Sequence, residues 1–103
     1  MLGQYDDLTS DRQAKTLRRI VQATRETGND SWILASSKGG GTLIGMTNSH
    51  NIENAPGERA FYEVLGSSGY VHISMGSRGS LIVTPIKKAF EFVDQAGYPP
   101  VTR

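Results

Sequence analysis

The sequence predicts a small α+β domain in which the elements follow the order helix, strand pair, helix, β-hairpin, helix. Apolar residues recur at helical spacing in three segments, and short apolar or alternating runs lie between them. Glycine-rich stretches separate these segments. The length of 103 residues fits one domain. We therefore expect residues 1–103 to form a single domain, with residues 1–8 and 98–103 as flexible tails.

Composition excludes several classes of protein. The chain has no cysteine, which removes disulfides, thiol catalysis and thiolate metal sites. Its net charge of +1, from 11 basic and 10 acidic side chains, is too small to hold nucleic acid by charge alone. No run approaches the ~20 apolar residues of a membrane-spanning helix. The start of the chain has neither the basic nor the apolar part of a signal peptide. We expect a cytoplasmic protein without a membrane partner.

The first helix is predicted within the stretch from Leu8 to Asp30. Ser10 is a good N-cap, and Gln13 completes a capping-box pattern. Gly28 and its polar neighbours end the helix. The apolar stripe comprises Leu17, Ile20, Val21 and Thr24.

Basic residues cover the other faces of this first helix. They are Arg12, Lys15, Arg18, Arg19 and Arg25. A solvated face is the ordinary interpretation, and a helix that contacts phosphates is the alternative. Nearby acidic side chains weaken the positive field that contacts with phosphates would need.

The next segment is predicted to be a hairpin, or two strands joined by a flexible loop. The apolar runs 32–34 and 43–44 flank a serine- and glycine-rich connection. This connection resembles a phosphate loop in composition only. Lys38 precedes the glycines, whereas a phosphate loop places lysine after them at the start of a helix. We therefore expect no bound nucleotide.

The second helix is predicted over residues 54–65. Asn54 is the expected cap, and Pro56 suits the first helical turn. Phe61, Val64 and Leu65 form its apolar face, so that the helix would turn Arg59 and Tyr62 outward. The stretch 47–54 before it could hold a short helical turn.

A hairpin and a third helix follow. Alternation over residues 70–75 and an apolar run in 80–84 predict two antiparallel strands. Gly76 and Gly79 would supply the positive φ values of the tip, with Arg78 exposed between them. The third helix would have Thr84 as its cap, Pro85 as its first residue and Gly97 as its stop. The expected core residues are Leu17, Ile20, Trp32, Phe61, Leu65, Ile73, Ile82, Phe90 and Val93.

The second half of the chain resembles winged-helix domains. In these domains a helix leads into a pattern L-x-x-x-G-Y/L-I, a wing hairpin follows, and LT-x-x-G/A starts a terminal helix. The resemblance covers about residues 54–97. The matching positions are Leu65, Gly69, Tyr70, Val71, the tip 76–79, Val83, Thr84 and Ala89. Residues 29–54 could hold either a helix-turn-helix or a β-hairpin, and only the first would complete the winged-helix pattern.

The resemblance implies a protein that binds double-stranded DNA, in the manner of a transcriptional regulator. The candidate contact residues are Asn54, Arg59, Tyr62, Arg78, Lys87 and Lys88. Arg59 would pair with guanine and Asn54 with adenine, whereas Arg78 would reach phosphates or the minor groove. A single module of this size would bind weakly alone, so we expect a homodimer. Arg78 has a second interpretation as a charge that keeps the hairpin soluble.

Two other classes of function were weighed against DNA binding. The first is a protein–protein interaction module that kept the wing fold and lost its DNA contacts; Glu58 and Glu63 on the second helix favour it. The second is an enzyme, which we do not expect. His50 and His72 lack ligand spacing or a carboxylate pattern, and no serine lies in a nucleophile motif. We therefore expect no cofactor, no metal and no catalytic residue.

Overall fold

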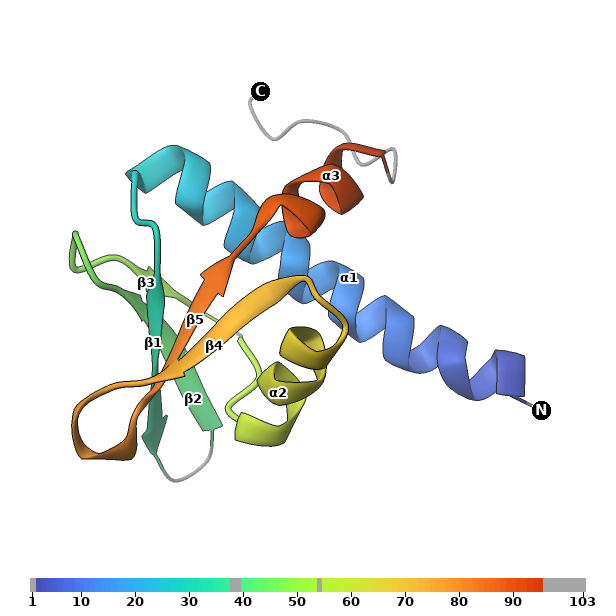
Figure 1. Cartoon of the computed structure of the whole chain (residues 1–103), viewed down its shortest axis with the longest axis horizontal. Helices are drawn as coiled ribbons and strands as arrows, with labels where there is room; N and C mark the ends of the chain where they lie inside the picture. Colours follow the sequence, from blue (N-terminus) through green and yellow to red (C-terminus); the bar gives the residue numbers. More distant parts are fainter. Residues whose placement is uncertain (1, 38–39, 54, 96–103) are drawn as a thin grey trace.

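A five-stranded antiparallel sheet organises the fold, as the computed structural model of the chain describes it for residues 2–37, 40–53 and 55–95. The strand order is β3-β2-β1-β5-β4. Three α-helices and one short 3-10 turn, η1, complete the described part. In Figure 1, α1 runs diagonally past the sheet, its N-terminal part extends beyond the strands, and α3 and α2 appear above and below its middle. The predicted α+β class and the order of its elements are confirmed.

Helix α1 is longer than the sequence predicted. It spans Leu2–Thr27, so that its backbone is already helical through most of the expected tail 1–8. Gly3 is the only glycine before Ser10, and there is no proline, so nothing in that stretch interrupts a helix. The predicted end is correct. Gly28 adopts a positive φ of 80°, and its amide donates to the carbonyl of Thr24 at 2.9 Å.

The described residues of the segment 29–53 form three strands with turns between them and contain no helix-turn-helix. Strands β1 (Trp32–Ser37) and β2 (Gly40–Gly45) pair from Trp32↔Gly45 to Ser37↔Gly40, which confirms the predicted hairpin. The helical turn considered for 47–54 is absent from the described residues there. A two-residue strand β3 (Asn51–Ile52) pairs with β2 instead.

Buried Asn29 explains the path of the chain after β2. Its Oδ1 accepts hydrogen bonds from the amides of Thr47 and Asn48 at 2.6 and 2.8 Å. Its Nδ2 donates to Thr27 Oγ1 at 2.9 Å. This side chain is fully buried and so fixes the bend that turns the chain back toward β3.

The predicted hairpin is confirmed, with a correction at its tip. Strands β4 (Val71–Met75) and β5 (Leu81–Pro85) are antiparallel, and η1 (Ser77–Gly79) joins them. Positive φ values occur at Arg78 (58°) and Gly79 (75°), whereas Gly76 has a φ of −103°. The expectation of a positive φ is therefore correct for Gly79 and wrong for Gly76; Arg78 takes that conformation instead. The hairpin is not an isolated wing, because β5 also pairs with β1.

Helix α2 begins later than predicted. It spans Arg59–Ser67, with Glu58 at the N-cap position. Pro56 disfavours helical geometry in the residue before it. The backbone at Gly57 also lies against β2, where a Cβ added to Gly41 would come within 3.2 Å of the Gly57 Cα. This close approach holds the segment before α2 extended. The predicted cap, Asn54, lies outside the described residues.

The buried face of α2 also differs from the prediction. Tyr62 is completely buried, whereas Val64 is 47% exposed. Gly66 explains the difference, because a Cβ at this position would collide with the side chain of Ile73 on β4. The helix therefore rests on β4 through Gly66, and its neighbours Tyr62 and Leu65 turn into the core.

Helix α3 spans Lys87–Gln95, two residues after its predicted start. Pro85 belongs to β5, and the amide of Ile86 donates to the carbonyl of Tyr70 at 3.1 Å. The β4–β5 ladder thus continues past the predicted cap Thr84. The predicted stop, Gly97, and the tail 98–103 lie outside the described residues.

One hydrophobic core joins the helices to the sheet. Of the nine predicted core residues, five are buried: Leu17, Ile20, Trp32, Leu65 and Val93. Phe61, Ile73 and Phe90 are partly buried and pack against the core. Ile82 is partly buried but lies on the other face of the sheet. None of the described helices is long and apolar enough to cross a membrane.

Candidate functional site

The two faces of the sheet have different surroundings. In β1, Trp32 and Leu34 are buried, whereas Ile33 and Ala35 between them are only partly buried. The strand residues in the hydrophobic core all share the face of Trp32: they are Trp32, Leu34, Leu43, Ile52, Val71, Leu81 and Val83. The helices contribute to the same core cluster. The described helices therefore cover one face, and the opposite face is left open.

A row of isoleucines crosses this open face. Ile33 on β1 pairs with Ile44 on β2 on one side and with Ile82 on β5 on the other. All three are partly buried, and none belongs to the core cluster. Asn51 and Ser74 continue the row at its two ends. Neighbouring cross-strand side chains lie about 5 Å apart, so the row is a continuous apolar stripe.

The five strands of the described chain contain no aspartate, glutamate, lysine or arginine. The described side chains of the open face are therefore isoleucine, alanine, serine, threonine, Asn51 and one histidine, His72. An antiparallel sheet with a solvated face ordinarily alternates apolar residues with polar or charged ones. The absence of charge and the isoleucine stripe distinguish this face from an ordinary solvated one.

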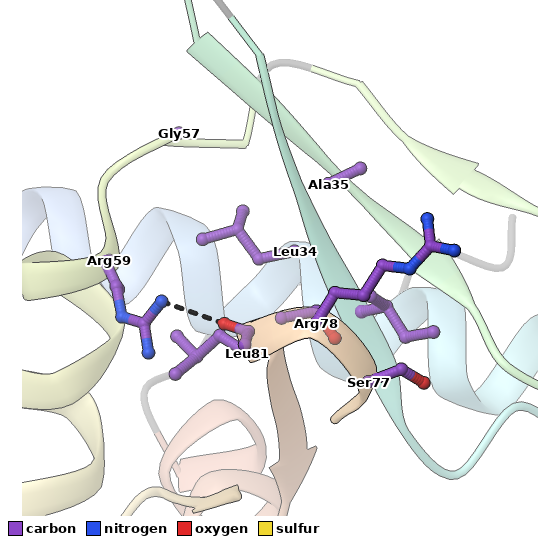
Figure 2. A pocket seen from close by; sticks show the side chains of 10 residues that line it. Leu34, Ala35, Gly57, Arg59, Ser77, Arg78 and Leu81 are labelled. Carbon is purple, nitrogen blue, oxygen red and sulfur yellow. Dashed lines mark hydrogen bonds between the residues drawn. The ribbon is translucent and has the colours of Figure 1, made fainter. Parts of the chain in front are cut away.

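An open pocket of about 740 Å³ lies beside the hairpin tip. Its walls come from the end of β1, the segment before α2 and the tip itself, as Figure 2 shows. Leu34 and Leu81 give it apolar, buried surface. Arg59 and Arg78 also line it, and no acidic residue is among the described residues that do. The fold thus brings together these two of the six predicted DNA contacts.

Arg59 is held by the protein itself. Its Nη1 donates to the carbonyl of Gly79 at 3.0 Å, and its Nη2 approaches the sulfur of Met75 at 3.2 Å. Its Nε lies 3.8 Å from the carboxylate of Glu63 one turn further along α2. Arg59 therefore ties the start of α2 to the hairpin tip, while 47% of its side chain remains exposed.

Arg78 has the opposite character. Its side chain is exposed and has no hydrogen bond or ion pair with any residue in the described ranges. Figure 2 shows its guanidinium pointing away from Arg59, on the side of Ala35. The sequence prediction that Arg78 lies exposed at the tip is correct.

The remaining predicted contacts are elsewhere. Lys87 forms an ion pair with Glu91 at 3.6 Å, and Lys88 donates to the carbonyl of Ser68 at 2.8 Å. Lys88 also lies 4.6 Å from the ring centroid of Tyr70. These two lysines are at the start of α3, and neither lines the pocket. Asn54 lies outside the described residues.

Tyr62 is corrected as a candidate contact. It is fully buried, its hydroxyl has no hydrogen-bond partner among the described residues, and burial raises its pKa. It therefore belongs to the core. A ligand could reach it only if α2 moved away from the sheet.

The histidines do not form a metal site. His50 packs edge-on against Trp32 with ring centroids 6.3 Å apart, and His72 lies on the open sheet face. No group of three or more potential ligands occurs among the described residues.

The open sheet face is the feature that sequence reasoning missed. Ile33 was assigned to an apolar run without a direction, and Ile82 was wrongly expected in the core, because every residue of 32–35 and of 81–83 is apolar. The period of two gives no preferred face in such a run. The lack of charged residues in all five strands was the signal that could have found it.

Comparisons of the chain with protein-family models, curated proteins and solved structures give no match. The functional argument therefore rests on the geometry of the open face and the pocket.

Proposed function

We propose that this domain is a protein-interaction module, that its open sheet face is the docking surface, and that a second copy of the chain occupies it. The observation that carries the proposal is the isoleucine stripe of Ile33, Ile44 and Ile82 on an uncharged face. Contiguous exposed apolar surface on a small protein is typical of an interaction site.

Charge favours a second copy over an unrelated protein. A two-fold interface places the same surface on both sides, so any charged side chain on the face would lie near the same charge on the partner. The described strands carry no charged side chain, so no such repulsion between like charges arises. Two sheets can pack face to face about 10 Å apart, with interdigitating side chains of the size of isoleucine and threonine.

The area of the open sheet face sets the expected affinity of self-association. Five strands about 4.8 Å apart and about five residues long give a face of roughly 20 by 17 Å. The corrugated surface on such a face amounts to several hundred Å² per copy. Standard interfaces bury about 800 Å² per partner, so this one is at the lower end. We expect a dissociation constant on the order of micromolar.

Duplex DNA, the partner implied by the winged-helix resemblance, is the second candidate. The exposed Arg78 at the hairpin tip favours it. Three contacts count against it: Arg59 is bound to Gly79, Lys87 is paired with Glu91, and Lys88 is bound to Ser68. A mobility-shift titration at low and high salt tests this candidate, since phosphate contacts weaken as salt rises.

The test of the leading proposal is sedimentation of the protein over a wide concentration range. We expect a monomer–dimer equilibrium, and we expect Ile33→Lys or Ile44→Lys to leave a monomer, because either change buries two charges at the interface. The control is Val64→Lys, which places lysine at an apolar site on α2 that is more exposed than Ile33 or Ile44. A wild-type protein that stays monomeric at high concentration would overturn the proposal.

A further inference from the structure

At the hairpin tip, Arg78 adopts a backbone conformation with positive φ that is rare for arginine. The amide of Ser80 donates to the carbonyl of Ser77 at 3.1 Å, and this bond closes a turn whose central residues are Arg78 and Gly79. Both have positive φ. Turns of this kind strongly favour asparagine or glycine at the first central position, because other residues are strained there. Arginine at position 78 is therefore poorly suited to the turn itself.

The turn nevertheless holds Arg78 in a defined place. The amide of Gly76 donates to the carbonyl of Ser80 at 2.8 Å, which closes the base of the tip. Arg59 binds the carbonyl of Gly79 from the other side. Arg59 is thus a positioning residue. Arg78 is left as the unpaired cation of the pocket among the described residues.

The backbone of β1 adds hydrogen-bonding capacity at the same place. The β1–β5 ladder ends at Leu34↔Leu81, whereas β1 continues to Ser37 with β2 alone. In an antiparallel ladder, alternate residues direct their N–H and C=O groups to the same neighbour. After Leu34, the next residue that faces the β5 side is Ser36. Its backbone N–H is therefore directed toward the hairpin tip.

We propose that the pocket beside the hairpin tip binds a carboxylate group, carried by an acidic residue with apolar neighbours in an extended segment of a partner protein. Arg78 pairs with the carboxylate. Ile33 and Ala35, the partly accessible apolar residues of the pocket wall, provide apolar surface for the neighbouring residues. One unpaired guanidinium matches one carboxylate, and a charge-assisted pair of this kind is stronger than a neutral hydrogen bond. This proposal does not depend on self-association through the open face.

The observations favour a peptide carboxylate over a DNA phosphate. DNA presents a dense row of charges, and binding it takes several cations. The pocket offers one unpaired arginine among apolar and hydroxyl-bearing residues. The proposal also accounts for arginine at position 78, since asparagine or glycine would serve the turn better but could not pair with an anion.

The experiment is a titration of the isotopically labelled full chain, followed by NMR. The probe is a short blocked peptide of alternating valine and glutamate, and its matched control has glutamine in place of glutamate. We expect the glutamate peptide to shift the Arg78 side chain and the amides around Gly79 and Ser36. We expect the glutamine peptide to bind at least about 10-fold more weakly. Equal binding of the two peptides would overturn the proposal.

Variants and further probes sharpen the result. Arg78→Asn keeps the turn and should weaken binding of the glutamate peptide about 10-fold or more, whereas Arg19→Asn, at an exposed site on α1, should leave it unchanged. Acetate alone should shift the same signals only at much higher concentration, which separates a peptide site from a site for free acids. Tighter binding of acetate, inorganic phosphate or a DNA duplex than of the peptide would contradict the proposal. The titration repeated on Ile44→Lys, which does not line the pocket, should give the same result, whether or not the wild-type protein dimerises.

Discussion

Ile33 on β1 and Ile82 on β5 lie directly opposite each other, on the sheet face that none of the described helices covers. Their neighbours in the same strands, Trp32 and Val83, form the equivalent pair on the helix-covered face and are fully buried. One strand pair thus contributes both to the core of the domain and to the apolar stripe on the open face. The first contribution stabilises the fold, and the second leaves surface for a partner.

Replacing Arg78 by asparagine should stabilise the protein. Asparagine adopts the positive φ of position 78 more readily than arginine does, so the free energy of unfolding should rise by about 0.5–1 kcal/mol. Urea unfolding of both proteins measures this difference. A fall in stability would mean that the arginine side chain supports the turn, in disagreement with its lack of contacts.

Removing the Tyr62 hydroxyl should not lower the free energy of unfolding. The hydroxyl is buried and has no hydrogen-bond partner, which is unfavourable by about 1–3 kcal/mol. Tyr62→Phe should therefore raise the free energy of unfolding by about 1 kcal/mol, measured by denaturant titration. Tyr62→Ala, the contrasting variant, should lower it by about 3–5 kcal/mol, because it leaves a cavity in the core. Destabilisation by phenylalanine would show that the hydroxyl has a partner in solution.

Asn29 should be essential to the segment after β2. Asn29→Ala leaves the amides of Thr47 and Asn48 without their acceptor, and we expect a loss of about 1–3 kcal/mol. Gly45→Ala should destabilise through the same side chain, because a Cβ at Gly45 would collide with the Asn29 amide. Thermal melts of both variants measure the effect. Gly28→Ala is not a suitable control because its φ is positive, so Met46→Ala, at an exposed site, serves instead.

The ion pair between α1 and α3 should make stability depend on pH in the acid range. Arg25 donates two hydrogen bonds of 3.0 Å to Asp94, and these bonds hold the pKa of Asp94 below its ordinary value. A lowered folded-state pKa contributes stability above the unfolded-state pKa of about 3.9, and this contribution is lost as pH falls through the folded-state value.

The matched comparison is Asp94→Asn against the wild type. The wild type should melt higher at neutral pH, and the difference should disappear as the solution is acidified. The pair is exposed, so raised salt should reduce the difference at neutral pH as well. A difference that stays constant from neutral to acid pH would contradict this assignment.

The sequence predicted the order of elements but not all of their limits. The turns at Gly28 and Gly79 were recognisable because glycine is favoured at positive φ. The start of α2 was not, since the approach of Gly57 to Gly41 joins residues distant in the sequence. The exposure of Arg78 was predicted correctly. Its positive φ was not, because predicting it requires knowing which residues take the central positions of the turn.

The candidate site, too, could be predicted only in part from the sequence. Arg59 and Arg78 come from separate elements, and their shared pocket follows from the packing of α2 beside the hairpin. Tyr62 was assigned outward because Phe61 and Val64 seemed to define the apolar face. The contact between Gly66 and Ile73 rotates that face, and a helical pattern alone cannot report which residue meets a neighbouring strand.

The most direct test of the docking surface is the sedimentation equilibrium of the wild-type protein, compared with Ile33→Lys and Val64→Lys. The wild type and Val64→Lys should reach a dimer at the highest concentrations, with a dissociation constant on the order of micromolar. Ile33→Lys should remain a monomer and retain a cooperative thermal melt. Identical sedimentation of all three proteins as monomers, or dimers that persist in folded Ile33→Lys, would contradict an interface on the open sheet face.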